Sequence, residues 1–156
     1  MGANRDELLF QGINPALGEL AAQVLAENGI PFQKDYCLEI PFTPGTKNEA
    51  VRALLSRPDR PTAMLVSDDI LASFLEGQCR EMGISVPGEL SIISFNNSLF
   101  SMLTTPPLTT VDINSLQLGI EAASQMISHI ENPNLMATKT IVPHHIVERE
   151  SCAPAG

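Results

Sequence analysis

The stretch from residue 60 to residue 83, RPTAMLVSDDILASFLEGQCREMG, decides the fold. Its run at 63–66 is apolar without interruption, which is typical of a buried strand in a parallel sheet. Asp68 and Asp69 are residue types that start helices, and apolar residues then recur at helical spacing until Gly83. A buried strand that leads directly into an amphipathic helix predicts a strand–helix unit of an α/β protein.

The same alternation of strands and helices extends in both directions from this stretch. Apolar runs typical of strands occur at 8–10, 36–40, 90–95, 139–142 and 145–147. Helical patterns occur at 15–28, 48–55 and 114–131. The segment 104–111 contains Pro106-Pro107, and consecutive prolines exclude a helix there. This order predicts an α/β fold in which helices sandwich a parallel sheet, with right-handed crossovers.

Composition excludes several classes of protein. The chain has 156 residues, of which 44% are hydrophobic and 17% charged, so it is neither a disordered tail nor a membrane-spanning segment. Its net charge of -9 and the lack of a Lys/Arg cluster disfavour nucleic-acid binding by this chain itself. Three cysteines without a CxxC pair favour a reducing compartment, and the first residues show no signal-peptide pattern. We therefore expect a cytoplasmic location.

Side chains suited to a sugar follow three of the predicted strands: Phe42, Asp68 and Asn96. Ligands of open α/β sheets bind outside the carboxyl ends of the strands. An aromatic ring packs on the C–H face of a sugar, and carboxylate and amide groups orient its hydroxyls. The pattern is thus typical of a site for a neutral polyhydroxylated ligand. The alternative is that Asp68 only caps a helix and that Asn96 and Asn97 only form a turn.

The sequence predicts no catalytic residue, no metal site and no cofactor. No GxSxG, GxGxxG or Walker motif is present. His144 and His145 are adjacent, and adjacent strand residues point to opposite faces, so they are poorly placed to share an ion. A hydrolytic enzyme that uses Asp68 and Asp69 stays open as an alternative, although neighbouring residues at a helix start point in different directions.

Four motifs, in this order, resemble those of the lac-repressor (LacI/GalR) family of transcription regulators. They are RPTAMLVSDDILA (60–72), EMGISVPGELSIISF (81–95), PPLTTV (106–111) and VERES (147–151). The resemblance implies a periplasmic-binding-protein-like lobe within a partial two-lobed core, and a regulator without enzymatic activity. Departures from the family pattern at 94–97, 111–114 and 142–145 resemble its branch of maltose-operon repressors.

The resemblance also divides the chain. Residues 4–111 correspond to the C-terminal lobe of the effector-binding core, and residues 112–140 to a crossover helix that belongs to the N-terminal lobe. Residues 141–152 correspond to the returning terminal strand. The DNA-binding headpiece of the family has no counterpart here, which implies that operator DNA is bound only through a headpiece outside this chain.

The resemblance implies maltose or a maltodextrin as the effector. Phe42 would stack on a glucose ring, and Asp68 and Asn96 would bind its hydroxyls. The family has a ligand-anchoring Arg after the first strand of this lobe, and no Arg matches it within 13–18. A lobe of an extracytoplasmic sugar-binding protein, which shares the two-lobed architecture, is a further alternative that the missing signal peptide disfavours.

The resemblance further implies a homodimer without membrane contact. The interface would include Ile70 and Phe74 on the helix after the Asp pair, and Phe100 and Met102 in the apolar stretch 99–103. Apolar residues at such a position are typical of an interface. Ordinary packing into the core is the alternative.

Overall fold

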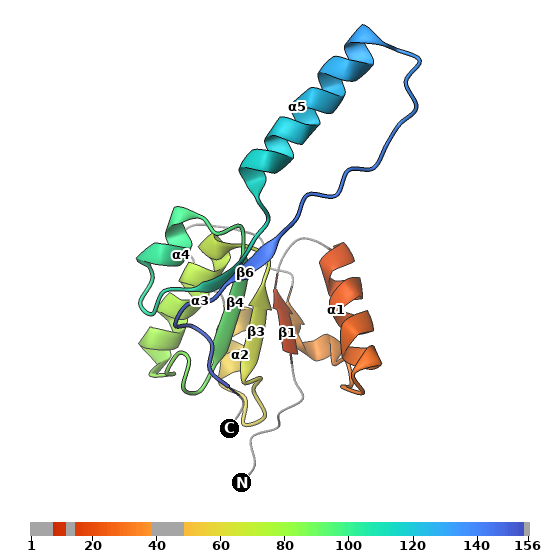
Figure 1. Ribbon diagram of the computed structural model, residues 1–156. Coiled ribbons are helices and arrows are strands. Elements are labelled where there is room, and N and C mark those ends of the chain that lie inside the picture. The colour runs from red at the N-terminus through yellow and green to blue at the C-terminus, as the bar shows by residue number, and fades with distance from the viewer. Residues whose placement is uncertain (1–7, 12–14, 39–48, 155–156) are drawn as a thin grey trace.

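A computed structural model of the chain describes residues 8–11, 15–38 and 49–154 (Figure 1). The strands are β1 (Leu8–Gln11), β2 (Cys37–Leu38), β3 (Ala63–Val66), β4 (Ser91–Phe95), β5 (Thr109–Asp112) and β6 (His145–Val147). The helices are α1 (Pro15–Glu27), the 3-10 turn η1 (Lys34–Tyr36), α2 (Glu49–Leu55), α3 (Asp69–Met82), α4 (Leu99–Leu103) and α5 (Ser115–Glu131). Strands and helices alternate along the chain as the sequence predicts.

The six strands form one sheet in the order β2-β1-β3-β4-β5-β6. All pairs from β2 to β5 are parallel, and β6 runs antiparallel to β5. Because crossovers are right-handed, the reversal of strand order after β2 puts α1 on one face and α2 and α3 on the other. The predicted helix-covered parallel sheet is confirmed.

The core lies between the sheet and the helices α2 and α3. Burial alternates along β3 and β4, so Met64, Val66 and Ile92 face the core while their neighbours are half-buried. Leu75 and Cys79 of α3 pack against them from the helix side. This period of two follows from the pleat of the strands, which sends successive side chains to opposite faces.

Two local predictions need correction. The segment 139–142 forms no strand; it runs back beside α5, where Gln125 bonds Thr138 and Thr140, and only β6 reaches the sheet (Figure 1). The stretch 99–103 is the helix α4, whose five residues are too few to show a helical repeat in the sequence. Among the described residues, no helix has the length and hydrophobicity needed to cross a lipid bilayer.

The chain separates into a lobe and an arm. We call α5 together with residues 132–144 the arm, and the remaining described residues the lobe. The arm leaves the end of β5, projects away from the lobe, and returns to β6 (Figure 1). No residue of α5 is buried, and Leu116 and Ile130 are 78% and 71% exposed. The predicted amphipathic helix is present, and its apolar residues are exposed to solvent.

Candidate functional site

The carboxyl ends of the parallel strands form one edge of the sheet, which we call the carboxyl edge. Asp68 follows β3, Asn96 follows the neighbouring strand β4, and Asp112 ends β5. The arm leaves the lobe at this same edge (Figure 1). The topology thus brings two of the three predicted ligand residues, Asp68 and Asn96, to one edge. Phe42 lies outside the described residues.

Asp68 is the N-cap of α3. Its backbone is extended, and its Oδ1 accepts a hydrogen bond of 2.9 Å from the Leu71 amide. At the other end of α3, Gly83 adopts a left-handed conformation with a φ of 73° and closes the helix. The capping interpretation of Asp68 is therefore confirmed. A cap of this kind occupies one carboxylate oxygen, so it is compatible with a ligand contact through the other.

Asn96 and Asn97 form a left-handed turn after β4. Their φ angles are 99° and 45°, a region in which Asn is more frequent than most residues. The Asn96 amide donates to the Val111 carbonyl over 2.9 Å, and the Asn97 amide to Thr110 Oγ1 over 3.3 Å. The turn interpretation is confirmed, and it leaves the Asn96 side chain exposed at the carboxyl edge.

The carboxylate of Asp69 connects β4, β5 and the start of α4 at the carboxyl edge. Its side chain is buried, with 1% of the residue exposed. Oδ1 accepts hydrogen bonds from Ser94 Oγ at 2.5 Å and Thr110 Oγ1 at 2.8 Å, and Oδ2 accepts one from the Ser98 amide at 2.6 Å. A buried carboxylate is tolerated only when it is bonded in this way. Asp68 and Asp69 therefore bind different partners, and the geometry does not favour the hydrolase that would use them as a pair.

Asn97 joins this turn to both strands that carry the arm. Its Nδ2 donates to Asp112 Oδ2 over 2.9 Å, and its Oδ1 accepts from Arg149 Nη2 over 2.6 Å. The second oxygen of Asp112 accepts from the Asn114 amide at 2.7 Å. The hydrogen bonds from Asn97 and Asn114 lower the pKa of Asp112 below its ordinary value of 3.8. His145, which lies opposite Asp112 on β6, lowers it further through its charge.

The segment after β6 is tied deep into the lobe. Ser151 is fully buried; its Oγ donates to the Ile92 carbonyl and accepts from the Thr109 amide over 2.8 Å. Arg149 donates through Nη1 to the Leu108 carbonyl over 2.7 Å and to Ser101 Oγ over 3.1 Å. The VERES motif is therefore a structural tie between the terminal segment, β5 and α4.

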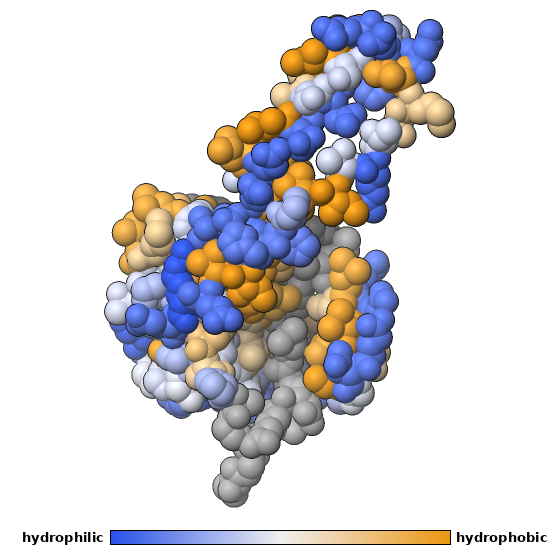
Figure 2. All heavy atoms as spheres, viewed as in Figure 1, coloured by the Kyte–Doolittle hydropathy of each residue, from blue (hydrophilic) through white to orange (hydrophobic). Residues whose placement is uncertain are grey.

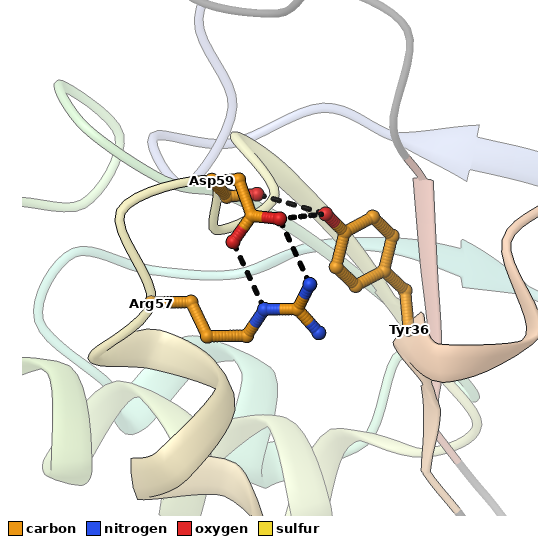
Figure 3. A network of polar contacts seen from close by, with 3 residues as sticks. All are labelled: Tyr36, Arg57 and Asp59. Carbon is orange, nitrogen blue, oxygen red and sulfur yellow. Dashed lines mark hydrogen bonds and ion pairs between the residues drawn. The ribbon is translucent and has the colours of Figure 1, made fainter.

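A second polar network lies at the opposite, amino end of the sheet (Figure 3). Arg57 donates to both carboxylate oxygens of Asp59, and the buried Tyr36 hydroxyl donates to the Asp59 carbonyl over 2.9 Å. The Arg57 guanidinium also stacks over the Tyr36 ring at 4.9 Å. The hydrogen bond from Arg57 lowers the pKa of Asp59 to about 2, so this carboxylate stays ionised and stabilises the turn before β3.

Glu76 is the exception among the buried acids. Only 2% of this α3 residue is exposed, and neither carboxylate oxygen makes a well-formed hydrogen bond. Burial raises its pKa above the ordinary value of 4.5, which the nearby Thr104 hydroxyl only partly offsets. Glu76 lies near the start of the turn that leads to Pro106, away from the carboxyl edge, so it has no part in the candidate site.

The predicted interface residues form a surface patch. Phe74 of α3 and Phe100 and Met102 of α4 are 43%, 47% and 53% exposed, and Ile70 is half-buried. Figure 2 shows apolar residues gathered over α4. The alternative of ordinary core packing is therefore wrong for Phe74, Phe100 and Met102. Their role in a dimer stays a prediction.

No metal centre is evident in the part of the chain that the structure describes. Within the ranges 8–11, 15–38 and 49–154, no three His, Cys, Asp or Glu residues are grouped so that they could hold an ion. His144 and His145 both lie at the exposed start of β6. The groups available at the carboxyl edge are hydrogen-bonding carboxylates and amides.

The chain is similar to known transcription regulators. Residues 11–152 match the family described as periplasmic binding protein-like domain. Catabolite control protein A of Priestia megaterium is 30% identical over 129 residues, which are 83% of this chain and 39% of that protein. The HTH-type transcriptional repressor PurR of Shigella dysenteriae is 30% identical over 142 residues, 90% of this chain and 42% of that protein.

A solved structure shows the same fold. A LacI transcriptional regulator from Bacillus cereus subsp. cytotoxis superposes with a TM-score of 0.87 at 32% identity, covering 95% of this chain and 55% of that one. The chain thus spans about half the length, or less, of the proteins it matches. From the matched residues and the shared architecture, the chain belongs to the periplasmic-binding-protein-like family, as part of the effector-binding domain of LacI/GalR-type transcriptional regulators.

Proposed function

We propose that this chain is the effector-binding and dimerisation portion of a cytoplasmic repressor that responds to maltose or a maltodextrin. The observation that carries the proposal is the carboxyl edge. It presents Asp68 and Asn96 on neighbouring strands, beside the point at which the arm leaves the lobe. Ligands of open parallel sheets bind at this edge.

The chemistry of the edge favours a neutral sugar. Asp68 can accept hydrogen bonds from sugar hydroxyls, and the amide of Asn96 can both donate and accept. A carboxylate at the site repels an anion, and no Arg within 13–18 provides the fork that binds phosphate well. Phe42 supplies the stacking ring in this proposal. A phosphorylated sugar is therefore the less favoured effector.

The arm belongs, in this proposal, to a first lobe outside the chain. Its exposed apolar residues need a partner, and the relatives are well over twice as long as the matched region. We assign 112–140 to the crossover helix of that lobe and 141–152 to the strand that returns from it. A sugar bound between two lobes shifts the balance of their orientations, which couples the sugar to operator affinity.

Operator DNA is then bound by a headpiece outside this chain. The net charge of -9 gives the chain itself no electrostatic attraction for a phosphate backbone. A gel-shift assay with the 156-residue chain alone should show no sequence-specific complex. Specific retardation at moderate salt would contradict this part of the proposal.

The patch of Phe74, Phe100 and Met102, together with the half-buried Ile70, is proposed as part of a homodimer interface. A charge placed in such a patch costs its full desolvation on association. We expect Phe100→Glu or Met102→Glu to shift the chain from dimer to monomer in light scattering. Met136→Glu on the arm, where the residue is 86% exposed, is the matched control. A wild-type chain that stays monomeric at high concentration would contradict the interface.

Calorimetry of the full-length protein against maltose, maltotriose, trehalose and trehalose 6-phosphate tests the proposed effector. We expect maltose or maltotriose to bind, and Asp68→Ala to weaken binding about tenfold or more, since it removes hydrogen bonds to a charged acceptor. Asp68→Asn, a residue that also caps helices, separates a ligand role from capping, and Asp59→Ala at the amino end should bind normally. Unchanged affinity in Asp68→Ala would contradict the site.

A further inference from the structure

Both strands that connect the lobe with the arm are held by one side chain of the β4–α4 turn. Asn97 donates to Asp112 at the end of the outgoing strand β5, and it accepts from Arg149 just after the returning strand β6. An amide suits this position because it offers a donor and an acceptor at once. A carboxylate in its place could bind Arg149 but would repel Asp112.

The same turn presents Asn96 to the carboxyl edge. Asn96 and Asn97 are consecutive left-handed residues, so a change in the conformation of one is passed directly to the other. Their backbone amides are fixed on β5 through Val111 and Thr110. A ligand that pulls on Asn96 therefore acts on the residue that holds the two connecting strands.

The start of the arm depends on this contact. Asn114, the N-cap of α5, is left-handed, with φ 53° and ψ 54°. Its side chain makes no capping hydrogen bond, and its backbone amide donates to the Asp112 carboxylate. Asn97 holds the other oxygen of that carboxylate. The direction in which α5 leaves the lobe is thus set by a short chain of contacts from Asn97 through Asp112 to Asn114.

We infer that Asn97 is the positioning residue that couples occupancy of the effector site to the orientation of the arm. This inference rests on the proposed function, because it needs a ligand at Asn96. Asn97 does not itself contact the sugar in this account; it acts through Asp112 and Arg149. Its substitution should remove the response of the arm and change effector affinity far less than a substitution of Asn96 does.

The first measurement is the pKa of Asp112, followed by NMR of its side-chain carboxyl carbon during a pH titration. Asp112 is surrounded by Asn97, the Asn114 amide and His145. We expect its pKa to rise in Asn97→Ala, which removes a donor, and to rise further in Asn97→Asp, which adds a negative charge. A loss of structure alone would not make the pKa of Asp112 higher in Asn97→Asp than in Asn97→Ala.

The second measurement is the amide resonance of Asn114 in the full-length protein, with and without maltose. We expect maltose to shift it in the wild type and to leave it unshifted in Asn97→Ala, while that variant still binds maltose with an affinity close to that of the wild type. Asn97→Gly, which suits a φ of 45°, should behave like Asn97→Ala and guards against a folding artefact. Asn96→Ala should do the reverse: it should bind maltose about tenfold more weakly and keep the pKa of Asp112.

The outcomes separate the inference from the proposed function. A maltose-dependent Asn114 shift that survives in Asn97→Ala, or an Asp112 pKa that ignores Asn97, would overturn the inference. So would a loss of maltose binding in Asn97→Ala and Asn97→Gly, because Asn97 would then be a ligand residue. If the folded wild type binds no sugar in calorimetry, the proposed function fails and the coupling with it. The Asp112 titration would then still show whether Asn97 holds the carboxylate.

Discussion

The lobe and the arm each contain a helix with an apolar side, but only the helix of the lobe buries that side. In the lobe, α3 buries Leu71, Leu75 and Cys79 against the sheet. In the arm, α5 is longer and has an equally clear apolar side, yet none of its residues is buried. Figure 2 shows apolar residues along the arm, and those of α5 are exposed to solvent. An apolar helix side therefore indicates that a partner exists, and the rest of the fold decides whether this chain supplies it.

The sharpest way to test this contrast is to delete one apolar side chain from each region. Leu75→Ala in the core should lower the free energy of unfolding by about 2–5 kcal/mol, since it leaves a cavity. Ile130→Ala in the arm should change it by less than about 0.5 kcal/mol, as exposed positions do. Urea denaturation followed by circular dichroism measures both. A large loss in Ile130→Ala would mean that the arm is already packed.

The two neighbouring acids of the carboxyl edge extend the comparison to polar groups. Asp69→Ala should lower the free energy of unfolding by about 3 kcal/mol. It leaves the hydroxyls of Ser94 and Thr110 and the Ser98 amide without their acceptor in the interior. Asp68→Ala loses only a helix cap and should cost about 1 kcal/mol. The same denaturation experiment checks the order. Equal losses would show that the buried network contributes little beyond capping.

Substitution of Glu76 should change the free energy of unfolding least, and the size of that change depends on pH. Its pKa is raised in the folded state, so the folded protein holds a proton that the unfolded chain releases near pH 4.5. The Glu76 contribution to stability therefore falls as the pH rises from about 4.5 through the folded-state pKa. We expect Glu76→Gln to match the wild type near pH 4 and to be more stable at pH 7. Thermal unfolding at several pH values measures this; curves that stay parallel would contradict the buried, unpaired acid.

Much of the fold could be predicted from the sequence because its signals are local. The apolar run at 63–66, the cap at Asp68 and the stop at Gly83 each define an element boundary that the structure confirms. The strand predicted at 139–142 is wrong. Its apolar residues resemble an edge strand, but this segment lies in the arm, away from the sheet. Helix α4 was missed because it is only slightly longer than one turn.

The candidate site was predictable only in part. The positions of Asp68 and Asn96 follow from the rule that strand ends meet at one edge, which the sequence alone supports. Asp69, Asn97 and Arg149 act through partners that lie 15 to 52 residues away in the chain. Only the tertiary fold brings such pairs together. The VERES motif marked Arg149 as a family residue, but its contacts with α4 and Asn97 could not be derived from spacing.

The most direct test of the account is amide hydrogen exchange of the full-length protein with and without maltose. The central claim is that the carboxyl edge, where the arm leaves the lobe, binds the effector. Maltose should slow exchange at 67–71, 96–98 and 112–118, and it should leave the amino-end turn at 57–62 unchanged. Sugar-dependent protection at 57–62, or binding of maltose with no change at the carboxyl edge, would contradict the claim.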